Sequence, residues 1–278
     1  MGRLAGKVAL VTGAGRARGL GQAIARRLAS EGAAVVIHDR GAVAGEIAPA
    51  HGVGVASEME AVAEGIRAET GARVATVTGD LLDEAALAGV VEGAVGAFGG
   101  LDILVNNAGI GYLFGPLVEQ EAAHLDAVMG VNLRAPMRLT ALAAKVMIAA
   151  GKGGRVVNIA SQAGKSGFAF ATAYTASKHG LIGFTRAAAM ELAPHGITVN
   201  AVCPNHVTTG LGAWQNAFMA AARGETVEQY LAGMRGRIPL GRVGTPEDTA
   251  AAVAFLCSDD AAYVTAEAMN VSGGEEYH

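Results

Sequence analysis

Cysteine is almost absent from this chain of 278 residues, which contains only Cys203 and Cys257. Two cysteines cannot build a disulfide framework, and no cluster of Cys and His residues has the spacing of a zinc site. Disulfides persist mainly in oxidising compartments. The sequence therefore predicts a protein of the reducing cytoplasm that uses neither disulfides nor a metal.

Charge is also scarce, because charged residues make up 17% of the chain. The 21 Lys and Arg residues against 25 Asp and Glu give a net charge of −4, and no basic run offers a footprint for a phosphate backbone. No uncharged apolar stretch reaches the about 20 residues that span a bilayer, and residues 1–15 lack the charged and apolar regions of a secretory leader. We therefore expect neither nucleic acid nor a membrane as a partner.

Hydrophobic residues are plentiful, at 51% of the chain, and short β-branched runs alternate with Ala-rich helical stretches. The expected strands are residues 8–12, 34–38, 73–78, 102–105, 155–160, 198–202 and 268–271, and the expected helices are residues 21–30, 58–70, 84–98, 119–149, 171–193 and 246–257. This alternation predicts βαβ units and a parallel sheet covered on both faces. No linker or repeat divides the chain, so a single domain of residues 1–278 is expected.

Two stretches fit the alternation badly. Residues 41–57 are rich in Gly and Ala and contain Pro49, which predicts a surface insertion. Residues 209–244 hold the only tryptophan, Trp214, in a partly helical segment flanked by glycines. Long ordered loops are often functional lids, so we expect this segment to cover a substrate. The alternative is a surface helical hairpin that packs its own aromatic side chains.

A glycine-rich loop joins the first expected strand to the first helix. Backbone N–H groups and the positive end of a helix dipole suit a pyrophosphate at such a junction. A plain tight turn is the alternative, but it would hardly require four glycines. The residues assigned to this site are Gly13, Gly15, Arg18, Gly19, Leu20 and Gly21.

Asp39 follows the second expected strand, where a carboxylate can accept both hydroxyls of an adenosine ribose and repel a 2′-phosphate. This position favours NAD as the cofactor. Arg40 and Arg18 stand against that preference, since either could pair with the 2′-phosphate of NADP. A solvated Asp-Arg turn is the competing interpretation for Arg40.

Tyr174 and Lys178 are four residues apart on an expected helix, which places them on one face. An ammonium beside a phenol favours the phenolate and moves its pKa from about 10 toward neutrality. Such a pair can serve as acid and base for a carbonyl or alcohol oxygen. Ser161, at the end of the fifth expected strand, lies close by in sequence. An exposed chance pair is the alternative.

These motifs, in this order, resemble the short-chain dehydrogenase/reductase family of single-domain type over residues 8–274. The resemblance implies a Rossmann-type, doubly wound parallel sheet. It implies that Tyr174 passes a proton to or from the substrate oxygen and that Lys178 lowers the pKa of that tyrosine and holds the nicotinamide ribose. By the same resemblance, Ser161 orients the substrate oxygen and Asn132 supports a water in the proton relay.

The resemblance also extends the expected cofactor site and implies a homotetramer. Asp80 and Leu81 match an adenine contact, and Asn107 sits in an Asn-Asn-Ala-Gly motif beside the adenosine half. The full set added in this way is Asp80, Leu81, Asn107, Ala108, Gly109, Pro204, Val207 and Thr209, the last two as carboxamide contacts. The tetramer is expected to be built on the two long helices, residues 119–149 and 171–193, which carry more apolar residues than one sheet face needs.

Three features depart from the family pattern. The glycine loop is two residues longer, so that either Gly13 or Gly15 can be its first member. Asn205 stands after Pro204 where glycine is usual. The insertion at residues 41–57 has no counterpart in shorter members and is expected to cap the adenosine end or to meet a neighbouring subunit.

The expected substrate pocket is mostly aromatic. Its walls are drawn from residues near Ser161 and Tyr174, namely Tyr112, Phe114, Gln162, Phe168, His206, Trp214 and Phe218. Burying apolar surface favours a bulky or cyclic secondary alcohol or ketone as the small-molecule substrate. A polyol or sugar is the alternative, because Gln162 and His206 can satisfy polar groups.

Rival functions are disfavoured by the same residues. A dinucleotide-binding regulator without catalysis would not need all four catalytic positions. An enoyl-thioester reductase of this fold separates its Tyr and Lys more widely, by the family resemblance, and an epimerase would need a longer C-terminal substrate region.

Overall fold

A computed structural model of the chain describes residues 2–42, 55–111, 113–207 and 209–278. Within these ranges, seven parallel strands form one sheet in the order β3-β2-β1-β4-β5-β6-β7. The strands are β1 (Val8–Thr12), β2 (Ala34–Asp39), β3 (Val74–Thr78), β4 (Ile103–Asn106), β5 (Gly154–Ile159), β6 (Ile197–Pro204) and β7 (Ala268–Val271). This single-domain architecture confirms the predicted Rossmann-type α/β fold.

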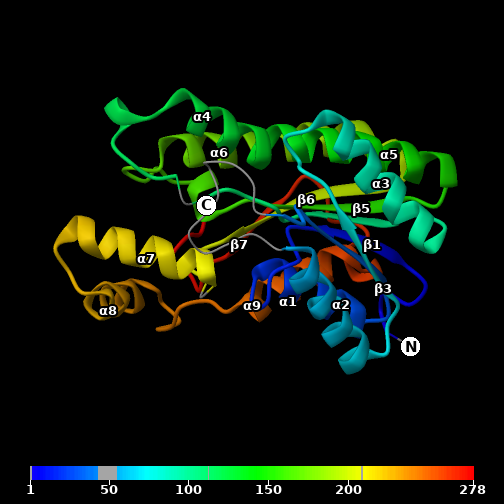
Figure 1. Cartoon of the computed structure of the whole chain (residues 1–278), viewed down its shortest axis with the longest axis horizontal. Helices are drawn as coiled ribbons and strands as arrows, with labels where there is room; N and C mark the ends of the chain where they lie inside the picture. Colours follow the sequence, from blue (N-terminus) through cyan, green and yellow to red (C-terminus); the bar gives the residue numbers. More distant parts are fainter. Residues whose placement is uncertain (1, 43–54, 112, 208) are drawn as a thin grey trace.

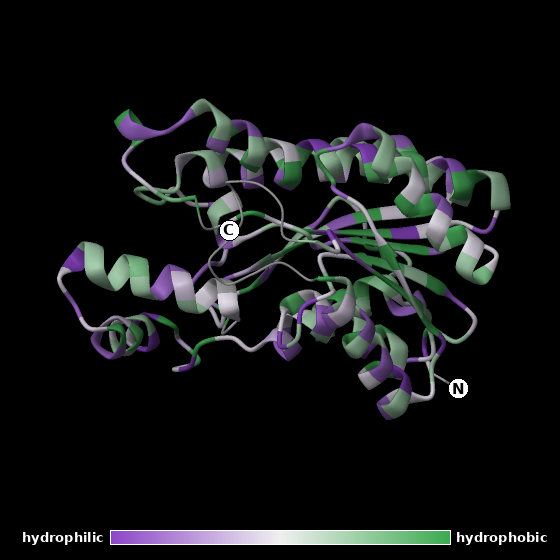
Figure 2. Ribbon diagram, in the orientation of Figure 1, coloured by the Kyte–Doolittle hydropathy of each residue, from purple (hydrophilic) through white to green (hydrophobic). Residues whose placement is uncertain are grey.

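Helices cover both faces of the sheet (Figure 1). On one face, α1 (Leu20–Ser30), α2 (Ala56–Thr70) and α9 (Pro246–Cys257) enclose one hydrophobic cluster. On the other, α3 (Glu84–Phe98), α5 (Ala135–Ala150) and α6 (Thr172–Leu192) enclose a second. Strands buried on both faces are nearly continuous apolar runs, and all residues of β1 and β6 are buried. In Figure 2 the helices alternate between hydrophobic and hydrophilic residues, as elements with one buried face do.

The strand order creates a crevice at the carboxyl ends of the central strands β1 and β4. The chain passes from β1 to β2 on one side, whereas β4 lies on the other side of β1. Ligands of open parallel sheets bind outside the carboxyl ends of the strands at such a switch point. The glycine loop after Thr12 and the Asn-Asn-Ala-Gly turn after Val105 both start at this edge.

The expected single helix over residues 119–149 is wrong in one respect. The chain instead forms a 3-10 turn (η1, Leu117–Glu119), helix α4 (Ala122–Met129), a π-helical turn (η2, Gly130–Arg134) and then α5. Pro136 explains part of this break, because proline has no N–H to bond to the carbonyl of Asn132 four residues earlier. The π turn is where the candidate residue Asn132 lies.

The other expected elements are confirmed with shifts of one to a few residues. Residues 209–244 contain α7 (Gly210–Arg223) and α8 (Val227–Arg237), which project from one end of the molecule in Figure 1. Short 3-10 turns complete the fold: η3 (Gln162–Gly164), η4 (Ala193–His195) and η5 (Asp259–Ala261). Of the insertion at residues 41–57, a bridge between Gly41 and Val55 is described, while residues 43–54 lie outside the described ranges. No helix in the described part of the chain is long and apolar enough to cross a membrane.

Candidate active site

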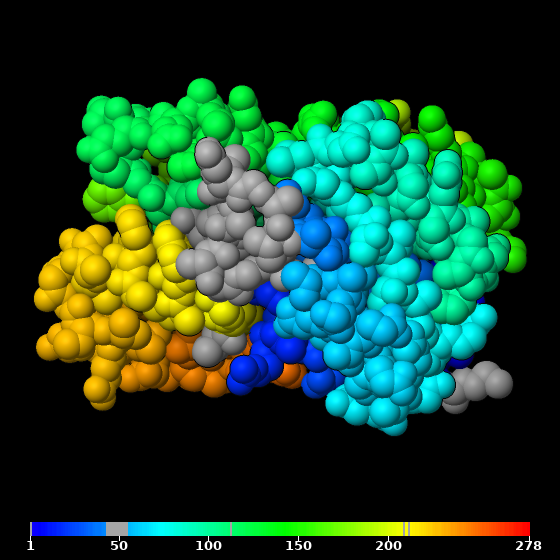
Figure 3. All heavy atoms as spheres, viewed as in Figure 1, coloured from blue at the N-terminus to red at the C-terminus, as the bar shows by residue number. Residues whose placement is uncertain are grey.

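A cavity of about 660 Å³ runs along the carboxyl ends of the strands. The residues that line it come from the glycine loop, from the turns after β2, β3, β4, β5 and β6, from α4, α6, α7 and α8, and from the segment after β7. Figure 3 shows the two lobes that bound it, the green surface over α4 and the yellow to orange surface over α7 and α8. In the described part of the chain, no group of three His, Cys, Asp or Glu residues could hold a metal ion.

Most of the expected cofactor residues line this cavity. They are Gly13, Gly19, Leu20, Gly21, Asp39, Arg40, Asp80, Leu81, Asn107, Ala108, Gly109, Tyr174, Lys178, Pro204, Val207 and Thr209. Gly15 and Arg18 are the two expected residues that are not in the lining. Arg18 takes a positive φ of 56° and is exposed, whereas Arg16 lines the cavity in its place.

The geometry of the glycine loop fits a pyrophosphate. Gly13 has a φ of 64°, and a Cβ there would lie 2.7 Å from the Cα of Ala108. A Cβ on Gly21 would lie 2.4 Å from the carbonyl oxygen of Gly13. No side chain caps α1 at Gly19, so the first N–H groups of the helix stay available at the cavity. Gly13, Gly19 and Gly21 are thus the glycines of the cradle.

Gly15 has a different place, beside the acidic residue after β2. Its N–H donates to Oδ2 of Asp39 over 3.0 Å, and a Cβ on Gly15 would lie 2.8 Å from the Cβ of Asp39. Oδ1 of Asp39 accepts a hydrogen bond of 2.9 Å from the backbone N–H of Arg40. The guanidinium of Arg40 forms an ion pair of 2.9 Å with Asp80. Asp39, Arg40 and Asp80 therefore form one linked group of charges in the cavity lining.

The side chain of Asn107 forms hydrogen bonds with the glycine loop. Its Nδ2 donates to the carbonyl oxygens of Thr12 at 2.8 Å and Gly13 at 3.0 Å. These bonds tie the glycine loop to the turn after β4, so the side chain shapes the cradle from behind.

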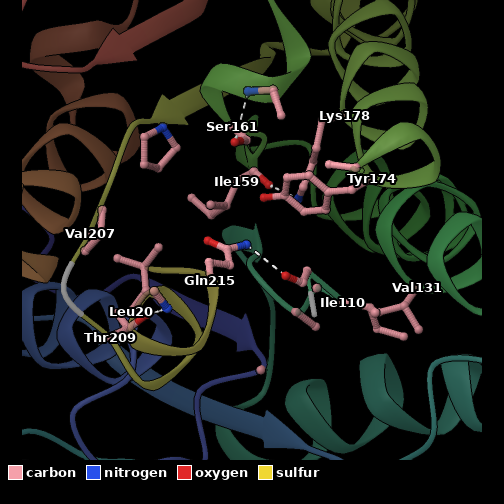
Figure 4. Close-up of a pocket in the computed structure, with 18 of the residues that line it drawn as sticks. Leu20, Ile110, Val131, Ile159, Ser161, Tyr174, Lys178, Val207, Thr209 and Gln215 are labelled. Carbon is pink, nitrogen blue, oxygen red and sulfur yellow. Dashed lines mark hydrogen bonds between the residues drawn. The ribbon is translucent and has the colours of Figure 1, made fainter. Parts of the chain in front are cut away.

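Ser161, Tyr174 and Lys178 come together where β5 ends and α6 begins (Figure 4). Ser161 precedes η3, and its Oγ accepts from the N–H of Ala163 at 3.1 Å. Nζ of Lys178 donates to the carbonyl oxygen of Ile159 at 2.8 Å and lies 5.6 Å from the centre of the Tyr174 ring. The cluster stands against the cavity, because all three residues line it.

The acidity of the pair differs from the expectation drawn from its spacing. Burial raises the pKa of Tyr174, and a hydrogen bond to Ser161 lowers it by less. Burial also lowers the pKa of Lys178 to about 8. The spacing placed the two side chains on one face as predicted, but the ammonium is directed to the Ile159 carbonyl rather than to the phenol oxygen. Tyr174 therefore holds its proton at neutral pH.

Asn132 is clamped by its side chain inside the π turn. Oδ1 accepts from the N–H of Ile110 at 2.7 Å, while Nδ2 donates to the carbonyl oxygen of Ile110 at 2.9 Å and to Oγ of Ser177 at 3.2 Å. The amide is thus fully used in joining the turn after β4 to α6. The backbone carbonyl of Asn132 receives no hydrogen bond from residue 136, because Pro136 has no N–H.

Only some of the residues expected to form the substrate pocket line the cavity. Phe114, Gln162, Phe168 and His206 line it, and burial lowers the pKa of His206 to about 4, which keeps that ring neutral. Tyr112 lies outside the described residues.

Trp214 and Phe218 are not in the cavity lining. They stack on each other at 5.5 Å, and both meet the ring of Phe114, at 5.9 and 6.0 Å. Phe114 in turn lies 5.9 Å from Tyr174. Trp214 therefore packs behind Phe114, one ring away from Tyr174, and is not itself part of the cavity wall.

Several lining residues have no counterpart among the predicted ones. They are Arg16, Gln215, Met219, Arg223, Tyr230, Arg237 and Glu275. The spacing of Gln215, Met219 and Arg223 at intervals of four residues on an expected helix is the one signal that could have revealed them.

Comparison with known proteins identifies the family. The family model described as enoyl-(acyl carrier protein) reductase matches residues 13–276. A short-chain dehydrogenase/reductase of Armillaria gallica is 37% identical over 97% of this chain and 95% of its own. Galactitol 2-dehydrogenase of Agrobacterium fabrum is 37% identical over 98% of both chains. Cis-4-hydroxycyclohexanecarboxylate dehydrogenase of Sinomonas cyclohexanicum is 38% identical over 96% of both.

Solved structures agree with these relatives. Carveol dehydrogenase from Mycobacterium avium in complex with NAD has a TM-score of 0.90 and 31% identity over 99% of both chains. An actinorhodin polyketide ketoreductase with NADPH has a TM-score of 0.87 and 37% identity over 98% of both chains. The chain belongs to the short-chain dehydrogenase/reductase family, a family of oxidoreductases.

Proposed function

We propose that this protein is an NAD(H)-dependent oxidoreductase that interconverts a bulky or cyclic secondary alcohol and its ketone. The observation that carries the proposal is the meeting of Ser161, Tyr174 and Lys178 at one wall of the cavity whose other end is the glycine cradle. An acid/base pair, an oxygen-orienting hydroxyl and a dinucleotide cradle in one cavity are the parts that such a reaction requires.

The residues of the cradle fit a nicotinamide dinucleotide. The uncapped N–H groups of α1 would bind the pyrophosphate, Asp39 the adenosine ribose, and Asp80 and Leu81 would border the adenine. Val207 and Thr209, which line the cavity, would contact the carboxamide, and Lys178 would hold the second ribose. When bound, the dinucleotide would donate a hydride to the substrate carbon or accept one from it.

The remaining task of the chain is to hold the substrate and to move a proton. Ser161 would donate a hydrogen bond to the substrate oxygen and so fix its place beside Tyr174. In ketone reduction the phenol of Tyr174 would give its proton to that oxygen, and in alcohol oxidation the phenolate would take the proton. In its ammonium form, Lys178 would stabilise that phenolate by its charge. A water on the backbone carbonyl of Asn132 would then restore the proton from solvent.

NAD is preferred over NADP in this proposal. Asp39 places a carboxylate where a 2′-phosphate would be repelled, and the ion pair with Asp80 already engages Arg40. Arg16 is the cation that works against this preference. Relatives bound to NAD and to NADPH both occur among the solved structures.

The substrate assignment rests on the rings around the cavity. Phe114 and Phe168 present apolar surface beside Tyr174, and α7 with α8 form a lid, within residues 209–244, over that side. Relatives named for carveol and for a cyclohexane ring support the assignment. Galactitol 2-dehydrogenase supports the alternative, a polyol, for which Gln162 and His206 offer hydrogen bonds.

A panel of alcohols tests the proposal, with NADH formation followed by absorbance. Cyclic secondary alcohols such as cyclohexanol should give a higher kcat/KM than open-chain polyols of similar size. If the polyols gave the highest kcat/KM, the substrate would be a polyol rather than a cyclic alcohol. Turnover of an enoyl thioester but of no alcohol would instead favour the activity named by the family model. NADH binding without turnover of any compound would favour a regulator.

A further inference from the structure

One end of the cavity carries a positive charge that the catalytic cluster does not use. Arg223 on α7 and Arg237 on α8 both line the cavity, together with Tyr230 and His206. Among the described residues, Arg223 has no carboxylate within salt-bridge distance. Its guanidinium lies 5.2 Å above the ring of Tyr230 instead. Arg223 therefore packs on one lining residue and lines the cavity itself.

The neighbouring charges do not cancel it. Arg237 pairs with Glu275 at 3.3 Å, and Glu275 also accepts a hydrogen bond from Asn205. Glu225 acts on Tyr230 but does not line the cavity. Two arginines and one carboxylate therefore leave one positive charge at this end.

Both arginines act on the same two groups. Burial lowers the pKa of His206 and raises that of Tyr230, and the positive charges of Arg223 and Arg237 exert a smaller lowering effect on both pKa values. The His206 ring lies 6.5 Å from the Tyr230 ring, so the four side chains form one cluster. A neutral imidazole and a phenol there can add hydrogen bonds to a ligand.

The distance from the catalytic residues sets the size of the ligand. Gln215, Met219 and Arg223 occupy one face of α7 at intervals of four residues. Gln215 donates to the carbonyl oxygen of Gly111 at 2.8 Å, which fixes this end of the helix beside the catalytic wall (Figure 4). Arg223 follows two turns later, about 12 Å along the helix axis. A six-membered ring that carries the reacting oxygen and, opposite it, a second substituent covers roughly half of that length, so the ligand needs a ring or a chain of comparable length.

We propose that Arg223, Arg237, His206 and Tyr230 form a subsite for a carboxylate on the far side of the substrate from its reacting oxygen. A carboxylate fits better than a larger or more highly charged group, because a single uncompensated guanidinium matches one negative charge and binds a planar carboxylate through two hydrogen bonds. This inference rests on the proposed function, and it narrows the substrate to a hydroxy acid or keto acid built on a ring or a bulky chain.

Arg223 also lies in the last turn of α7, where any cation gains from the helix dipole. An interaction with the helix dipole alone would require neither the contact of Arg223 with the Tyr230 ring nor a place in the cavity lining. The two interpretations predict different ligand binding, which makes the subsite testable.

The test compares two ligands of equal shape on the protein with NADH bound, by isothermal titration calorimetry. Cyclohexanecarboxylate should bind roughly tenfold more tightly than cyclohexanecarboxamide, because charge-assisted hydrogen bonds are stronger than neutral ones. Arg223→Met should abolish this preference, and Arg223→Lys should keep part of it. Arg235→Met is the matched control, since Arg235 is an exposed arginine of α8 that does not line the cavity, and it should keep all of the preference.

Equal affinities for the two ligands in the unchanged protein would overturn the subsite, as would a preference that Arg223→Met leaves intact. Calorimetry needs no turnover, so the result stands apart from the proposed function. Failure to oxidise any alcohol would refute that function. Good turnover of neutral cyclic alcohols with no preference for the carboxylate would refute only the subsite.

Discussion

Adding one methyl group at Gly21 should damage both the fold and the cofactor site. The new Cβ of Gly21→Ala would lie 2.4 Å from the carbonyl oxygen of Gly13 and 2.6 Å from Nδ2 of Asn107. The first of these atoms belongs to the backbone and cannot turn aside. Nδ2 of Asn107 also holds the loop through its bonds to Thr12 and Gly13, so relief of the clash breaks those bonds.

The size of the effect follows from the cost of overpacking. Extra methyl groups in packed sites cost about 1–3 kcal/mol. We expect the free energy of unfolding to fall by that amount and the affinity for NADH to fall about tenfold or more, since about 1.4 kcal/mol corresponds to a factor of ten. Urea unfolding and NADH titration by fluorescence measure the two quantities.

The same substitution at Gly89 is the matched control. Gly89 lies inside α3, and a Cβ there would meet nothing within 4 Å. Gly89→Ala should raise the stability by about 0.5–1 kcal/mol, because alanine loses less backbone entropy in a helix. It should leave NADH affinity unchanged. Normal NADH affinity in Gly21→Ala would refute the assignment of this loop as the pyrophosphate cradle.

Three further predictions follow from single features of the site. Asp39→Ala should narrow the preference of kcat/KM for NAD over NADP by leaving Arg16 and Arg40 to meet a 2′-phosphate, and a native preference for NADP would show that the arginines dominate. Burial lowers the pKa of His206 from 6.5 to about 4, so the unfolded chain binds more protons in that window and stability should fall as the pH falls from 6.5 to 4. Thermal melts of His206→Gln should show a smaller loss over the same window, and an unchanged loss would contradict the assigned burial. Exposed Met137 and Ile148 on α5 and Met190 on α6 suit an interface, so light scattering should show a homotetramer, whereas a monomer at micromolar concentration would end that proposal.

The fold could be predicted from patterns that are local and strong. The apolar run of β1 is buried along its whole length, as its composition indicates. The helix expected over residues 246–257 is α9, which begins after Thr245 with a capping box that Thr245 forms with Asp248. The break between α4 and α5 was missed, since the apolar periodicity continues across it and the effect of Pro136 on one backbone bond does not show in that periodicity.

The site was predicted where sequence spacing fixes geometry. Tyr174 and Lys178 lie together because four residues make about one helical turn. Sequence spacing does not reveal Arg223 and Arg237 as a pair, because they line one cavity only through the packing of α7 against α8. Arg16 rather than the expected Arg18 lines the cavity, and the loop turns at Arg18 with a positive φ, which spacing does not reveal. The pKa of Tyr174 depends on burial, which only the folded chain shows.

Turnover by Tyr174→Phe, measured together with NADH binding, tests the central claim most directly. Phenylalanine keeps the ring that packs on Phe114 at 5.9 Å and removes only the hydroxyl. The account predicts that kcat for a cyclic alcohol falls by about 10²- to 10⁴-fold, the range typical of a lost general acid/base, while NADH binds as before. Unchanged turnover in this variant would contradict the assignment of Tyr174, and with it the proposed reaction.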